Sequence, residues 1–133
     1  MVVVDSSVWI DFFGDHVSAQ RSTLRKLLDQ GETRIVVPDL VLFEVLRGFR
    51  HERHLRQARL LMQSLDVEAT GGETLALAAA EHYRALRDRG YTVRSGIDVL
   101  LAAFCIEHDY TLLHRDRDFD ALESLRGLKV WRH

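Results

Sequence analysis

Five acidic residues of this chain stand where carboxylates could do chemistry together. They are Asp5, Asp39, Glu44, Asp98 and Asp116. Asp5 directly follows the apolar run at 2–4, Asp116 lies just past the apolar run at 110–114, and Asp98 opens a stretch that is apolar nearly all round. In an open parallel sheet the carboxyl ends of the strands meet at one edge, so these side chains are expected to converge there.

Converging carboxylates need compensation in a folded protein. Two of them at about 4 Å repel by about 1 kcal/mol in water and by about 4 kcal/mol at an effective dielectric constant of about 20. A divalent cation removes this repulsion. Oxygen ligands without a cluster of cysteine or histidine favour Mg²⁺, with Mn²⁺ as the alternative, over zinc. Such a cation lowers the pKa of a bound water and offsets charge on a phosphodiester, so the acids predict metal-assisted hydrolysis.

Each acid taken alone also has a structural interpretation. Asp5 could accept hydrogen bonds from the next backbone amides, and Ser95 and Asp98 match a helix capping box. Asp118 could cap the helix that follows it, and Glu44 could face water. Short motifs of this kind often occur by chance, so the joint placement of the acids carries the prediction of a site.

The elements that must position these acids follow from the apolar pattern. Strands are expected at 2–4, 34–37, 110–114 and 128–131. Helices are expected at 8–13, 18–31, 39–49, 53–65, 73–90, 97–108 and 118–125, the first of them capped by Ser6 or Ser7. Strands that alternate with helices indicate a parallel sheet covered on both faces. We therefore expect a helix-rich α/β fold, with three α/β/α layers and four to five short central strands, in a single domain over 1–133.

Composition narrows the class of protein further. With 47% hydrophobic and 29% charged residues, the chain has the balance of an ordinary globular domain. It has neither an apolar run of membrane-spanning length nor a signal peptide, so a cytoplasmic protein without membrane contact is expected. Cys105 lies in an apolar run and is expected in the core. The net charge of -2 gives no overall signal for nucleic acid, but all of the 18 basic residues except Lys26 and Lys129 are arginine, which suits phosphate.

The sequence around the acids carries a family pattern. It consists of VVVDSSVWID at 2–11, VPDLVLFEVLRG around Glu44, and SGIDVLLAAFCIEHDYTLLHRDRDF, which holds Asp98 and Asp116. This pattern, which spans residues 2 to about 131, resembles the PIN domain and in particular the VapC toxins of bacterial type II toxin-antitoxin pairs. The resemblance implies a three-layer PIN-like fold and an endoribonuclease that hydrolyses RNA phosphodiester bonds with water activated by Mg²⁺ or Mn²⁺.

The resemblance also implies roles for single residues. The catalytic and metal-binding acids that it implies are Asp5, Glu44, Asp98 and Asp116. Asp118 would be a fifth metal ligand, directly or through water, and Ser7 matches a small hydroxyl residue that helps to order the site. His114 departs from the family pattern, in which a threonine or serine is usual. Arg115 and Arg117 are the expected RNA contacts because they flank Asp116, and His114 could also lie near the substrate.

Two protein partners are implied by the same resemblance. They are a second copy of the chain, in a homodimer, and a cognate VapB-type antitoxin that inhibits the enzyme and reaches the acids with a basic side chain. The apolar helix residues that could serve either interface are Leu42, Val45, Leu46, Leu61 and Leu65.

Two other functions compete with this interpretation. An aspartyl-phosphate phosphatase would need a second acid where Ser7 stands, and a phosphoreceiver would need a lysine after a late strand, whereas Lys129 lies within one. A catalytically silent PIN-like module could hold RNA or protein, although silent versions generally lose one or more of the acids. HERH at 51–54 is one residue short of a zinc motif and lies among arginines, so we interpret it as a solvated surface.

Overall fold

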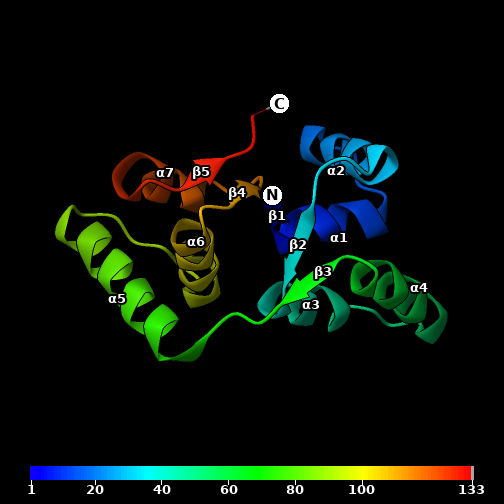
Figure 1. Cartoon of the computed structure of the whole chain (residues 1–133), viewed down its shortest axis with the longest axis horizontal. Helices are drawn as coiled ribbons and strands as arrows, with labels where there is room; N and C mark the ends of the chain where they lie inside the picture. Colours follow the sequence, from blue (N-terminus) through cyan, green and yellow to red (C-terminus); the bar gives the residue numbers. More distant parts are fainter. Residues whose placement is uncertain (133) are drawn as a thin grey trace.

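The computed structural model describes residues 1–132 and shows a five-stranded parallel sheet between two groups of helices (Figure 1). The strand order is β3-β2-β1-β4-β5. The strands are β1 (Val2–Val4), β2 (Ile35–Pro38), β3 (Asp66–Glu68), β4 (Thr111–Leu113) and β5 (Lys129–Val130). The helices are α1 (Ser6–Gly14), α2 (Ala19–Gln30), α3 (Asp39–Leu46), α4 (Glu52–Gln63), α5 (Gly72–Asp88), α6 (Gly96–His108), the 3₁₀-helix η1 (Arg117–Phe119) and α7 (Asp120–Arg126).

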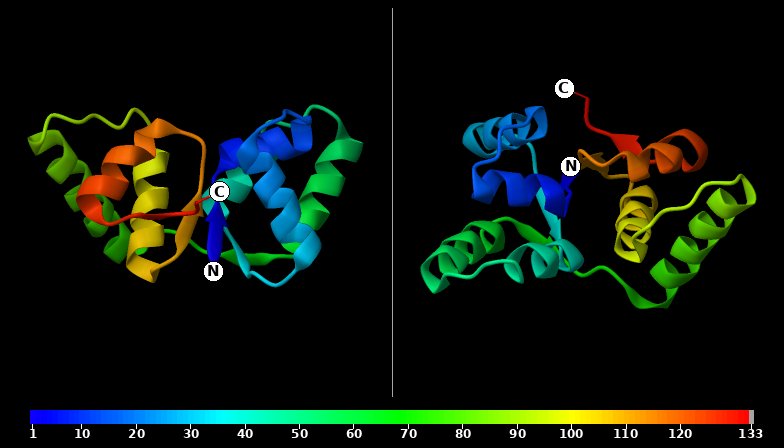
Figure 2. Two further views of the ribbon diagram at one scale, coloured as in Figure 1. Left: turned by 90° about the horizontal axis from the view of Figure 1, so that it is seen from above. Right: turned by 180° about the vertical axis from the view of Figure 1, so that it is seen from behind.

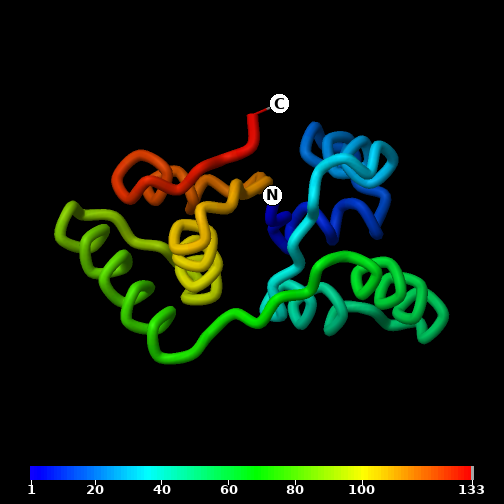
Figure 3. The backbone as a smooth tube through the Cα atoms, in the orientation of Figure 1, coloured from blue at the N-terminus to red at the C-terminus, as the bar shows by residue number. Residues whose placement is uncertain are grey.

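The helices form two layers, one on each side of the sheet. Helices α1 to α4 lie on one side and α5 to α7 on the other, as the two views of Figure 2 also show. The chain changes sides once, in the connection from β3 to α5, which Figure 3 traces beneath the sheet. The predicted α/β/α layering is therefore confirmed.

The central strand explains where the first acid lies. Val2, Val3 and Val4 are fully buried because β1 has neighbours on both sides, β2 and β4. The ladder continues for one more residue, since the backbone N–H of Asp5 donates to the carbonyl oxygen of Leu113 at 2.9 Å. The hydrogen-bonded strand thereby carries Asp5 to the carboxyl edge of the sheet.

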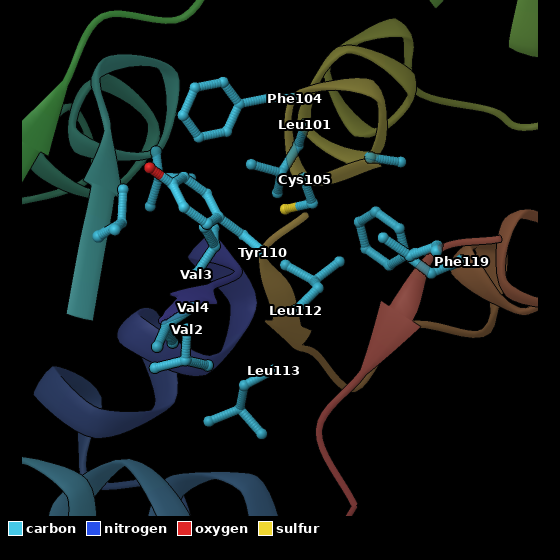
Figure 4. Packing of buried hydrophobic residues seen from close by; sticks show 14 of the residues in the cluster. Val2, Val3, Val4, Leu101, Phe104, Cys105, Tyr110, Leu112, Leu113 and Phe119 are labelled. Atoms are coloured by element: carbon cyan, nitrogen blue, oxygen red, sulfur yellow. The ribbon is translucent and has the colours of Figure 1, made fainter. Parts of the chain in front are cut away.

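Helix α6 is buried between the sheet and α5. Leu101, Phe104 and Cys105 project from it into the core, where the rings of Phe104 and Tyr110 lie 5.7 Å apart (Figure 4). Burial raises the pKa of the Cys105 thiol, which keeps it protonated and inert. The core role predicted for this cysteine is confirmed. None of the helices among residues 1–132 is sufficiently long and apolar to span a lipid bilayer.

Two details of the sequence prediction were wrong. The sequence pattern predicts no strand between residues 39 and 108, but this stretch contains the edge strand β3, whose Glu68 accepts a hydrogen bond from the Tyr110 hydroxyl at 3.0 Å. The first helix is capped by Asp5, not by Ser6 or Ser7: Asp5 has extended backbone angles, and its carboxylate accepts from the Ser7 backbone N–H.

Candidate metal centre

All the acids that the resemblance implies come together at the carboxyl edge of the sheet. Asp5 directly follows β1, Glu44 lies on α3 after β2, and Asp98 lies in the first turn of α6. Asp116 follows β4 and caps η1, which contains Asp118. Carboxylate oxygens of Asp98, Asp116 and Asp118 lie within 4.8 Å of one another.

Asp98 is the electrostatic centre of this group. Its pKa rises from 3.8 to about 7, mainly because its carboxyl group is removed from water, and further because four other carboxylates surround it. Those four carboxylates belong to Asp5, Asp116, Glu44 and Asp118. Within residues 1–132 the Asp98 side chain accepts no hydrogen bond and forms no ion pair. A group of like charges with so little compensation favours a bound cation.

Asp5 offers one free oxygen to the centre. Its Oδ2 atom accepts a hydrogen bond from the Ser7 hydroxyl at 2.5 Å, so Ser7 orients the carboxylate. Its Oδ1 atom is buried and has no hydrogen-bond partner in the described part of the chain. Burial raises the pKa of Asp5 against the Ser7 hydrogen bonds, which favour the charged form. An orphaned buried carboxylate oxygen is unusual in a folded protein and is a natural ligand for a cation.

Glu44 is held by a serine that sequence analysis assigned only to helix capping. The Ser6 hydroxyl donates to Oε1 of Glu44 at 3.1 Å and thereby ties α3 to the start of α1. Burial and the nearby Asp5 carboxylate raise the pKa of Glu44, while the Ser6 bond and Arg47 lower it. Glu44 therefore faces the other acids, and the interpretation in which it faces only water is wrong.

The hydrogen bonds show which of the other acids have the capping roles that the sequence suggests. Ser95 makes no side-chain hydrogen bond to the start of α6, so the capping box suggested for Asp98 is absent. Asp116, not Asp118, caps η1, accepting from the Asp118 backbone N–H at 2.9 Å. Asp118 instead lies 3.4 Å from the guanidinium of the exposed Arg94. Asp39 binds the backbone N–H and the hydroxyl of Thr70, and it is not among the acids that surround Asp98.

His114 lies beside the acids in a defined protonation state. Its Nδ1 accepts a hydrogen bond from the Asp116 backbone N–H at 3.1 Å, so the neutral ring carries its proton on Nε2. Burial lowers the pKa of His114, although Asp5 and Asp120 oppose this shift, and the neutral form is favoured at pH 7. Nε2 is buried without a partner among residues 1–132 and can donate a hydrogen bond to a bound molecule.

Arg115 has a partner that the sequence did not predict. Asp11, on the buried face of α1, forms an ion pair with Arg115 and also accepts from its guanidinium at 3.0 Å. This pair fastens the segment between β4 and η1 to α1. An acid inside the apolar run VWIDFF was the available signal, but its partner lies 104 residues away. Arg117 is exposed and forms no ion pair within the described residues.

Replacing Arg115 by alanine is expected to lower the free energy of unfolding by about 3 kcal/mol, because a buried carboxylate then loses its counter-charge. The Asp11 side chain is only 4% exposed, whereas that of Arg115 is 47% exposed. Asp11→Asn should therefore cost less, since the released guanidinium can turn to water. Urea unfolding of the two variants measures the difference, and an equal or larger loss in Asp11→Asn would contradict it.

The donor set fits a hard divalent cation. Within the described residues, the group that converges at the centre consists of carboxylate oxygens, without cysteine and without a histidine nitrogen, and this chemistry suits Mg²⁺ or Mn²⁺. Arg94 contacts this group through Asp118, and its side chain is 81% exposed, so solvent screens its charge.

The parallel sheet with an acidic centre at its carboxyl edge defines a class of protein, and sequence comparison identifies it. The PIN domain family matches residues 2–125. VapC ribonuclease Mb1587 of Mycobacterium bovis and ribonuclease VapC11 of Mycobacterium tuberculosis are each 34% identical to this chain over 133 residues, covering 98% of it and 97% of the relative. The chain therefore belongs to the PIN-domain family and, within it, to the VapC group.

Solved structures show the same fold. The VapBC2 complex of Rickettsia felis, bound to a promoter DNA fragment, aligns with a TM-score of 0.76 at 15% identity over 99% of this chain and 100% of that chain. FitAcB of Neisseria gonorrhoeae aligns with a TM-score of 0.76 at 16% identity, over 99% of this chain and 97% of that chain. VapC20 of Mycobacterium tuberculosis, described as a sarcin-ricin-loop-cleaving toxin, aligns with a TM-score of 0.67 at 19% identity over 96% of each chain.

Proposed function

We propose that this chain is the toxin of a type II toxin-antitoxin pair and cleaves RNA as a divalent-metal-dependent endoribonuclease. The observation that carries the proposal is the position of Asp98, which has four other carboxylates around it and, among residues 1–132, no cationic partner or hydrogen-bond donor of its own. The names of the relatives, which are ribonucleases and a toxin that cleaves the sarcin-ricin loop, support RNA as the substrate class.

The metal ligands that we propose are Asp5, Asp98 and Asp116, with Glu44 and Asp118 directly or through water. When bound, Mg²⁺ or Mn²⁺ supplies a more acidic water as nucleophile and offsets negative charge on the phosphodiester. Ser7 and Ser6 hold the carboxylates of Asp5 and Glu44 in fixed orientations.

Three side chains next to Asp116 are proposed to contact the RNA. The His114 Nε2–H can donate to a substrate oxygen, since its other nitrogen is already occupied. Arg117 is exposed and can bind a phosphate. Arg115 keeps roughly half of its side chain exposed despite its pair with Asp11, so its remaining N–H groups can do the same.

An antitoxin is the proposed inhibitor, and a homodimer is the proposed assembly. Among the apolar residues suggested for these interfaces, Val45 is buried in the core, and the others are half-buried against it. One of these residues, Val45, also lines an apolar groove that is open to solvent. A groove of about 220 Å³ between α1 and α3 is lined by Ile10, Phe13, Gly14, Val45, Gly48 and Phe49, and we infer that an apolar antitoxin segment binds there.

The rival functions receive less support from the geometry. Lys129 pairs with Asp109 at 2.6 Å, at the amino ends of β4 and β5, and so lies at the edge of the sheet opposite Asp5. A phosphoreceiver would need this lysine beside the acids. Asp98 is surrounded by the carboxylates of Asp5, Glu44, Asp116 and Asp118, and a silent module would have no need of this group.

Cleavage of structured RNA by the purified chain, free of antitoxin, tests the proposal. We expect cleavage with Mg²⁺ or Mn²⁺, complete loss with EDTA, and recovery when excess Mn²⁺ is added. The Asp5→Asn protein, purified in the same way, controls for a contaminating nuclease. Cleavage that persists in EDTA, or an acyl phosphate trapped on Asp5, would refute the assignment, whereas RNA binding without cleavage would indicate the silent module.

A further inference from the structure

A groove with its own chemistry lies next to the acidic centre. It measures about 320 Å³, at the lower end of the volumes of about 300 to 1,000 Å³ that are typical of small-ligand sites. Its walls come from the start of α2, the segment from the end of β4 into α7, and the end of β5 with the residues that follow it. Figures 1 and 2 show the segment directly after β5 on the side of the sheet where α2 lies. Its lining includes Gln20, His114, Arg117, Asp120, Trp131 and Arg132.

The groove opens on the same edge of the sheet as the acids. Strand β5 pairs in parallel with β4, and the backbone N–H of Trp131 donates to the Leu112 carbonyl at 2.9 Å. Trp131 therefore leaves its strand at the level where β4 leads to Asp116. His114 and Asp116 line the groove as well as the acidic centre, so one bound strand of RNA could occupy both.

The charges in the groove suit a base better than a phosphate. Arg132 is paired with Glu123 and Arg115 with Asp11, so an acidic partner offsets part of the positive charge of each. Asp120 adds a carboxylate without an ion-pair partner in the described part of the chain, which would repel a phosphate. Among residues 1–132, the groove groups without a hydrogen-bond partner are the Gln20 amide, the Asp120 carboxylate and the buried His114 Nε2–H, which together offer donors and acceptors to the edge of a base.

Trp131 supplies the flat apolar surface that a base requires. Its ring is packed partly against the core and partly exposed, and it lines the groove. Aromatic side chains bind unpaired RNA bases by stacking, with little dependence on sequence. Arg117, which has no ion-pair partner among residues 1–132, lies at the same groove and can bind the adjoining phosphate.

We propose that this groove is a nucleotide subsite, in which an unpaired RNA base adjoining the scissile phosphate stacks on Trp131 with its edge toward Gln20 and Asp120. The proposal rests on the proposed ribonuclease function and adds a recognition element outside the acids. It makes Trp131 a determinant of RNA binding and not of the chemical step.

The fluorescence of the native Trp131 ring tests whether a base binds at this subsite. The chain has two tryptophans, of which Trp9 is fully buried, so a soluble ligand can reach only Trp131. In the Asp5→Asn protein, short single-stranded RNA of mixed sequence should quench the emission, and Trp131→Phe in that background should remove the quenching. Inorganic polyphosphate, which has no bases, should not quench. Quenching by polyphosphate equal to that by RNA would overturn the proposal.

Cleavage kinetics provide a second test of the subsite, in single variants that keep all the acids. Trp131→Ala should raise KM about 5-fold or more, with little change in kcat. Trp131→Phe keeps an aromatic ring, so its KM should lie close to that of the parent. Tyr83→Ala, which removes an exposed ring from α5, is the matched control and should leave KM unchanged. If the parent cleaves RNA and Trp131→Ala cleaves it with the same KM, the subsite is wrong while the ribonuclease stands. If the parent cleaves no RNA, the proposed function itself fails.

Discussion

Replacement of Asp98 by asparagine is expected to lower the rate of RNA cleavage by more than about 100-fold, since residues that only support metal ligands already cost about 10- to 100-fold. The side chain keeps its shape but loses the charge that lies between the other four acids. The free amide also places N–H groups where a cation needs oxygen. Initial rates in saturating Mn²⁺, on the RNA that the parent cleaves best, measure the effect.

The fold of the Asp98→Asn protein should remain intact, because the carboxylate makes no hydrogen bond or ion pair within residues 1–132. Asp39→Asn is the matched control: this acid also follows β2 but bonds to Thr70, outside the acidic group. It should cleave RNA at close to the parental rate. Parental activity in Asp98→Asn, or an equal loss in Asp39→Asn, would remove the distinction on which the site assignment depends.

The metal-free protein is expected to lose stability as the pH rises from about 4 to above 7. The pKa of Asp98 is 3.8 in its ordinary state and about 7 in the folded chain, so the folded state holds a proton that the unfolded state has released. Stability from this group is complete below the ordinary pKa and disappears as the pH passes the folded value. The raised pKa values of Asp5 and Glu44 act in the same direction.

Divalent cations should reverse this loss. Mn²⁺ or Mg²⁺ binds the ionised carboxylates and stabilises only the folded chain, so the rise in Tm on adding metal should be larger at pH 8 than at pH 5. Thermal unfolding in EDTA and in Mn²⁺ at the two pH values measures both effects. Asp98→Asn should flatten the pH dependence in EDTA and reduce the metal effect. A metal effect that is as large at pH 5 as at pH 8 would contradict this account.

The positions of Asp5 and Asp116 at the edge of the sheet can be predicted from the sequence, because each follows a short apolar run that predicts a buried strand. The apolar run of β1 predicts a buried strand, and a buried parallel strand must deliver the next residue, Asp5, to the carboxyl edge. The same logic applies to Asp116 after β4. Glu44 and Asp98 lie on helices, and the family resemblance, more than periodicity, singled them out.

The features that sequence reasoning missed depend on contacts between distant segments. Strand β3 has three residues, two of them acidic, and it is held by its pairing with β2 and by Glu68 contacts that no local pattern reveals. Asp11 gains its role only when Arg115 reaches it. Trp131 appeared in the sequence only as the end of a strand, and it lines a groove because α2 lies opposite.

The central claim, that these carboxylates together hold a divalent cation, is tested most directly by anomalous diffraction from crystals grown with Mn²⁺ at pH 8. We expect one or two Mn²⁺ peaks within the acidic centre, with carboxylate oxygens of Asp5, Asp98 and Asp116 as ligands at about 2.0 to 2.3 Å. The same crystals of Asp98→Asn should show weaker peaks or none. A fully occupied Mn²⁺ site elsewhere, with the acidic centre empty, would contradict the account.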